Sequence, residues 1–140
     1  PAAVAEGMQA QCGPEVGKGL TTDPRMAETP DGWFNDRITG GETLIRVSDN
    51  DDESEVRFKD ARGTWRDSAD DGGVVMTAGL RARPPAFMVA VIYTTGVVET
   101  YMISDITDDN QATLIHTATK LNELQAFSRV MKASCKISFY

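Results

Sequence analysis

The stretch from Phe87 to Ser104, FMVAVIYTTGVVETYMIS, constrains the fold of this chain more than any other part. It holds the densest run of β-forming residues in the sequence, and only Thr95-Gly96 interrupts it. Two such runs joined by a short glycine-containing turn predict an antiparallel hairpin. With Thr95-Gly96 as a two-residue loop, Tyr93 would lie opposite Val98.

Both faces of this predicted hairpin are apolar. One face would carry alternate residues from Phe87 to Tyr93 and then Val98, Thr100 and Met102. The other would carry Met88, Ala90, Ile92, Val97, Tyr101 and Ile103, with Glu99 as its single charge. A ribbon that is apolar on both sides must be covered on both sides by other parts of the protein. The assignment of faces depends on the turn, because a shift of one residue moves every side chain to the opposite face.

Shorter strand candidates flank the hairpin, and tight acidic turns connect many of them. They are residues 43–48, 56–59, 63–67, 74–77 and 112–118, and the alternating stretch from Met131 to Phe139. This pattern predicts a mainly β fold, all-β or α+β, in which an antiparallel meander forms a small barrel or a strongly bent sheet.

One segment near the C-terminus has helical spacing instead. Leu121, Leu124, Phe127 and Met131 recur every three or four residues. We therefore expect one helix that ends at about Val130, followed by a terminal strand. This helix would cover the second apolar face of the central hairpin.

The amino-acid composition and the periodicity of the chain change near residue 30. Residues 1–30 are rich in glycine and proline and have no sustained period, so we expect an extended N-terminal arm. Residues 31–140 contain no repeat and no linker, and we expect them to form a single β-rich domain.

The two cysteines, Cys12 and Cys135, lie near opposite ends of the chain. A disulfide between them would fasten the arm to the domain and would indicate an oxidising compartment. The prediction that follows is a secreted or periplasmic bacterial protein. The alternative is two unrelated buried thiols.

The charge and hydropathy of the chain exclude several classes of partner. A formal charge of −7 over 140 residues would repel the phosphate backbone of a nucleic acid. No apolar run approaches the roughly 18 residues that a membrane-spanning helix needs. We expect no nucleic acid partner, no transmembrane segment and no cofactor, and the oligomeric state stays open.

An acidic stretch resembles a calcium loop in its spacing. Asp49, Asp51, Glu53 and Asp60 fall at positions used by such loops. However, Ser54 stands where the sharp turn requires glycine, and the flanking residues have the pattern of strands rather than helices. A solvated acidic hairpin loop is the main expectation, with calcium binding as its alternative.

His116 is the single histidine of the chain and lies in a predicted strand, on the same face as Leu114 and Ala118. A hydrogen-bonded structural histidine is the main expectation, and a catalytic one is the alternative. A carboxylate within hydrogen-bond distance of His116 on the floor of an open cleft would make an enzyme the leading hypothesis, ahead of a binding protein.

The sequence contains no assembled catalytic constellation, so the predicted function is binding. Candidate ligand-binding residues are the aromatic side chains Trp33, Phe34, Trp65 and Tyr101. We expect a small secreted or periplasmic non-enzymatic domain that binds a protein partner or a small apolar molecule. The alternatives are a hydrolase that uses aspartate and glutamate with His116, and a structural subunit of a cell-envelope assembly.

Overall fold

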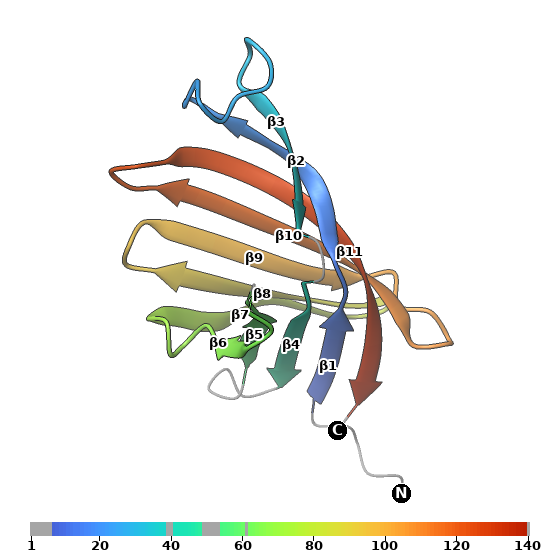
Figure 1. The fold of residues 1–140 in the computed structure, drawn as a ribbon. Helices are drawn as coiled ribbons and strands as arrows, with labels where there is room; N and C mark the ends of the chain where they lie inside the picture. Colours follow the sequence, from blue (N-terminus) through green and yellow to red (C-terminus); the bar gives the residue numbers. More distant parts are fainter. Residues whose placement is uncertain (1–6, 39–40, 49–53, 61, 140) are drawn as a thin grey trace, which may run out of the picture.

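A computed structural model describes residues 7–38, 41–48, 54–60 and 62–139 (Figure 1). These residues form eleven strands and no helix. The strands are β1 (Gly7–Cys12), β2 (Glu15–Thr21), β3 (Trp33–Ile38), β4 (Thr43–Ser48), β5 (Glu55–Lys59), β6 (Trp65–Asp67), β7 (Gly73–Ala82), β8 (Pro85–Tyr93), β9 (Val97–Ser104), β10 (Gln111–Leu121) and β11 (Ala126–Phe139).

The strands form one curled antiparallel sheet with the shape of a half-barrel (Figure 1). Its order is β6-β5-β4-β1-β11-β10-β9-β8-β7, so strands β7 to β11 are a meander. The long strand β11 pairs with β1 near its C-terminal end and with β2 nearer its start. Strand β3 pairs with β2 and extends that side of the sheet. The prediction of a mainly β, strongly bent antiparallel sheet is confirmed.

The predicted C-terminal helix is wrong. Strand β10 continues to Leu121, and β11 begins at Ala126. The turn between them is held by Asn122, whose Oδ1 accepts hydrogen bonds from the backbone N–H groups of Leu124 and Gln125, both at 2.9 Å. Leu121 and Leu124 are 71% and 78% exposed at this tip, so their spacing with Phe127 and Met131 does not reflect a shared buried face.

The central hairpin forms, but its predicted register is wrong by one residue. Tyr93 pairs with Val97, and Val89 pairs with Tyr101. The loop therefore has three residues rather than two, and Gly96 closes it with a positive φ of 90°. As a result Glu99 and Tyr101 lie on the same face as Tyr93, which is the concave face of the sheet.

The hydrophobic core fills one end of the concave side. It contains Ile45, Val47 and Val56 from β4 and β5, which face Val89, Val91, Ile103, Leu114 and Ile137 from the other strands. Strands β4 and β5 contact β8 and β7 across the hollow, and the hydroxyls of Ser54 and Thr77 are hydrogen bonded at 2.8 Å. The convex face has no cover among the described residues: Val74, Ile92 and Val98 are all exposed there.

The predicted disulfide between Cys12 and Cys135 is confirmed, and it joins directly opposed residues of β1 and β11. The described part of the predicted arm contains strands β1 and β2, which lie within the sheet. Strand pairing and the burial of Ala10 and Cys12 in the core together order this glycine-rich segment. Whether residues 31–140 would form a domain alone stays a prediction.

Candidate functional site

A cavity of about 410 Å³ lies on the concave side of the sheet, next to the core. Its apolar lining comes from Phe58, Tyr93, Val97, Ala118 and Phe127. Its charged and ionisable lining comes from Glu15, Glu42, Lys59, Asp71, Glu99, His116, Lys120 and Arg129. This volume is within the range of small-molecule sites, at the lower end.

Strand alternation places most of these groups in the cavity. Along β10, Leu114, His116 and Ala118 are buried on the concave face, and Lys120 follows them toward the end of the strand. His116 pairs with Tyr101 of β9 on one side and with Met131 of β11 on the other. Along β9, β10 and β11, the apolar core residues are therefore followed by polar side chains that line the cavity.

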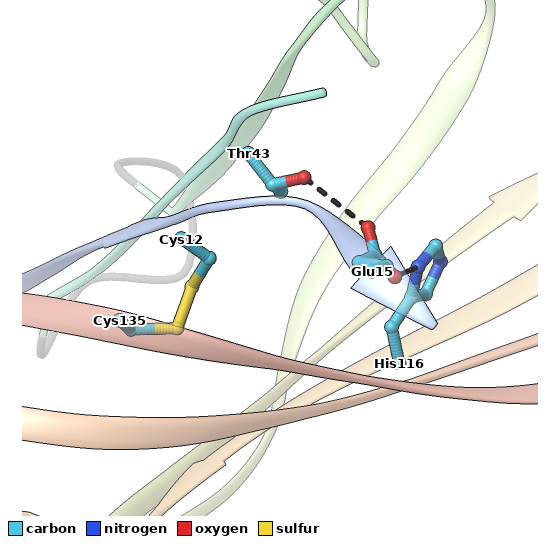
Figure 2. Close-up of a disulfide and its surroundings, with 5 residues drawn as sticks. All are labelled: Cys12, Glu15, Thr43, His116 and Cys135. Carbon is cyan, nitrogen blue, oxygen red and sulfur yellow. Dashed lines mark hydrogen bonds and ion pairs between the residues drawn. A yellow bond between two sulfur atoms is a disulfide. The ribbon is translucent and has the colours of Figure 1, made fainter. Parts of the chain in front are cut away.

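His116 is the centre of the cavity floor and is only 4% exposed. Its Nδ1 lies 2.6 Å from Oε1 of Glu15, the first residue of β2 (Figure 2). Glu15 also accepts a hydrogen bond from the hydroxyl of Thr43 at 3.5 Å. Glu15 thus ties β2 to β4 and β10, close to the point where the disulfide joins β1 to β11 (Figure 2).

A second carboxylate and an aromatic ring complete the floor. His116 Nε2 lies 3.3 Å from Oε1 of Glu99, at ion-pair distance but without the alignment of a hydrogen bond. The Tyr101 hydroxyl donates to Oε2 of Glu99 at 3.0 Å. The Tyr101 ring stacks on the imidazole, with centroids 4.1 Å apart and planes inclined by 14°.

These contacts determine the charge states on the floor. Burial disfavours a charged imidazole, but the hydrogen bond to Glu15 and the proximity of Glu99 outweigh it and raise the pKa of His116 to about 9. Burial likewise opposes ionisation of Glu99, yet His116, Tyr101 and Arg129 lower its pKa. Burial and the Glu99 charge raise the pKa of Tyr101 well above its usual value. At neutral pH the floor holds an imidazolium, a carboxylate and a neutral phenol.

The side chains of Lys120, Phe127 and Arg129 lie together, near the end of β10 and the start of β11. Lys120 pairs directly with Phe127, and its Nζ lies 5.4 Å from the centroid of that ring. The guanidinium of Arg129 lies 5.9 Å from the same ring. Arg129 Nη1 also donates to Oδ2 of Asp36 at 2.6 Å, which links β11 to β3.

The four aromatic residues predicted to bind a ligand lie in different places. Tyr101 lines the cavity, whereas Trp33 and Phe34 border a second hollow, of about 400 Å³, beside Lys18 and Glu28. Phe34 is buried edge-to-face against Phe127, with centroids 6.0 Å apart. Trp65 is 41% exposed on β6. A ligand-binding role for each of them stays a prediction.

Sequence reasoning missed the residues that surround His116 and Phe127. The predicted arm contains Glu15, the predicted hairpin has Glu99 on the face opposite Tyr93, and the predicted helix contains Arg129. One available signal is Gly96, because a three-residue loop ending in glycine places Glu99 and Tyr101 on the same face as Tyr93.

The calcium candidate falls largely outside the described residues, since it needs Asp49, Asp51 and Glu53. Asp60 is described, and its Oδ1 accepts hydrogen bonds from the backbone N–H groups of Arg62 and Thr64. Among the described ranges, no group of histidine, cysteine or acidic residues has metal-binding geometry. Over the same ranges, no helix is long and apolar enough to cross a membrane.

Comparison of the chain with known protein families, with characterised protein sequences and with solved structures finds no match.

Proposed function

We propose that this protein binds a small molecule in the concave cavity without transforming it. The observation that carries the proposal is the cavity itself, which combines apolar walls with an ordered polar floor. Binding sites commonly take this form, because apolar walls supply affinity and a few fixed polar groups orient the ligand. The walls include Phe58 from β5 and Val97 from β9.

The charge states of the floor favour binding over acid–base catalysis. An efficient general acid or base has a pKa near the working pH. The pKa of His116 is raised to about 9, and the pKa of Glu99 is lowered. The pKa of Tyr101 is raised well above the usual value of a tyrosine. Each group therefore keeps one protonation state around neutral pH, which suits a fixed binding surface.

We further propose that the protein works in an oxidising, extracytoplasmic compartment. The support is the buried Cys12–Cys135 bond, because structural disulfides persist mainly in such compartments. Both cysteines of the chain are used in it. A secreted or periplasmic binding protein is consistent with both the cavity and the disulfide.

Two adjacent valines allow a direct test. Val97 lines the cavity, whereas Val98 is exposed on the opposite face of the same strand. We expect Val97→Trp to fill the cavity and Val98→Trp to leave it open. The probe is phenylnaphthylamine, an uncharged aromatic fluorophore, titrated into each folded protein.

Wild type and V98W should bind the probe with similar affinity, and V97W should lose at least about tenfold, equivalent to about 1.4 kcal/mol. Circular dichroism and thermal melts of both variants establish that the fold is retained. Equal binding by all three proteins would refute the proposal, because the probe would then bind elsewhere, for example on the convex apolar face.

One observation favours a second candidate, a hydrolase. His116 lies within hydrogen-bond distance of Glu15 on the cavity floor, which is the arrangement expected to favour catalysis. A histidine held between two carboxylates can act as a general base only after it has lost its proton, which here requires alkaline pH. A hydrolase would therefore show turnover of a simple ester that rises toward pH ~9 and disappears in His116→Gln.

A further inference from the structure

The carboxylates that line the cavity already have partners. Glu15 and Glu99 flank His116, and Glu99 also accepts the hydrogen bond from Tyr101. At the rim, Glu42 pairs with Lys59 at 2.8 Å. Asp71, also at the rim, pairs with Arg66 at 2.6 Å. Each of these carboxylates therefore already has a partner in the protein, and Glu15 and Glu99 share the single imidazolium.

Two cations of the lining, Lys120 and Arg129, have polar atoms without a hydrogen-bond or ion-pair partner among the described residues. Lys120 lies near the Phe127 ring, and within the described part of the chain no carboxylate is at ion-pair distance from its ammonium group. Arg129 Nη1 donates a hydrogen bond to Asp36 Oδ2, whereas Arg129 Nε is buried and has no hydrogen-bond partner among the described residues. The Arg129 side chain also lines the cavity and is 22% exposed, so its guanidinium is accessible in part to a ligand there.

The sheet register brings these two cations together. Lys120 is directly opposite Phe127, and Ala118 is directly opposite Arg129. Lys120 and Arg129 are therefore diagonal neighbours on the concave face, at a Cα separation of about 7–8 Å. Long side chains at this separation can contact the same anionic group, with the Phe127 ring between them.

The apolar walls lie beside this pair. Val97 is directly opposite Lys120 on the other side of β10, and Tyr93 is directly opposite Val97. A molecule that placed an acidic group between Lys120 and Arg129 would extend its body over Val97, Tyr93 and Ala118, which all line the cavity.

We propose that the ligand is an organic anion with an apolar body, of aromatic-ring size, and one acidic group such as a carboxylate or sulfonate. Lys120 and Arg129 bind the acidic group, and the apolar walls bind the body. This inference rests on the proposed function and specifies the chemical class of its ligand.

A pair of related fluorophores tests the inference. Anilinonaphthalene sulfonate and phenylnaphthylamine share the same aromatic body, and only the first carries a negative group. Each is titrated into wild type, Lys120→Met, Arg129→Met and Lys132→Met. Lys132 is the matched control, because it is an exposed cation of β11 and does not line the cavity.

We expect wild type to bind the sulfonate more tightly than the uncharged probe. K120M and R129M should each weaken sulfonate binding by about tenfold, because each variant loses a charge-assisted hydrogen bond to the sulfonate. Both variants should still bind the uncharged probe, so the preference for the sulfonate over the uncharged probe should fall about tenfold, and K132M should alter neither affinity. R129M also removes the ion pair with Asp36 and can therefore disturb β3. K120M removes no ion pair with a carboxylate of the described residues, so it tests the inference independently.

Two outcomes would overturn the inference, and they are distinguishable. If both probes bind wild type equally and K120M changes neither, the anion specificity is refuted. In that case the proposed function still stands, provided that V97W blocks the uncharged probe. If V97W blocks neither probe, the cavity is not the binding site and both proposals fail.

Discussion

The strongest quantitative consequence of the cavity floor is a loss of stability as the pH rises through the pKa of His116. Folding raises this pKa from an ordinary value of 6.5 to about 9. Each unit of pKa shift corresponds to about 1.4 kcal/mol, so the imidazolium contributes about 3 kcal/mol to the free energy of unfolding. The contribution is complete below pH ~6.5 and is lost as the pH rises through about 9.

The single histidine makes the titration straightforward to measure. Its imidazole resonances can be followed by NMR from neutral to alkaline pH without overlap from another histidine. Urea denaturation at pH ~6.5 and pH ~9.5 then measures the linked change in stability. We expect an apparent pKa near 9 and a decrease of about 2–3 kcal/mol between the two conditions.

Matched variants identify the cause of the shift. Glu15→Gln removes the carboxylate 2.6 Å from His116 Nδ1, so it should lower the pKa of His116 and flatten the pH dependence of stability. Glu123→Gln, in the exposed turn between β10 and β11, should change neither quantity. A wild-type His116 that titrates near 6.5, with equal stability at both pH values, would refute the ion-paired floor.

Two further predictions concern the scaffold. Replacing Cys12 and Cys135 by alanine should destabilise the fold by up to about 5 kcal/mol, because the bond closes a span of 123 residues; an unchanged urea midpoint would contradict this. Gly17→Ala should cost at least about 1 kcal/mol, because a Cβ there would lie 1.9 Å from the Val130 carbonyl oxygen. Gly13→Ala is its control, since no atom lies within 4 Å of the added Cβ, and equal thermal melts of the two variants would argue against close packing of β2 on β11.

Local sequence patterns predicted the strands where side chains alternate cleanly. The alternation from Met131 to Phe139 indicated a terminal strand, and β11 contains it. The prediction was wrong at residues 119–130, where the helical spacing of Leu121 and Leu124 indicated a helix. An Asx turn at Asn122 is consistent with that sequence too, and pairing with β10 and β2 settles the choice.

The cavity could be predicted only in part. The sequence indicated His116 and Tyr101 as candidates, one as a structural or catalytic residue and the other as a ligand contact. It could not bring Glu15 to His116, because the two are separated by 101 residues and meet only through the pairing of β2 with β11. Contacts of this range depend on the topology of the sheet rather than on local propensity.

The sequence by itself therefore determined the class of fold, the central hairpin and the disulfide partners, because β-propensity, alternation and cysteine count are local or compositional properties. Only the tertiary structure decided how the faces of the two hairpin strands combine, because one extra loop residue, Thr94, places Glu99 and Tyr101 on the same face as Tyr93. The register of β9 against β10 places Glu99 beside His116 and Val97 opposite Lys120. The chemistry of the cavity follows from the register of the sheet.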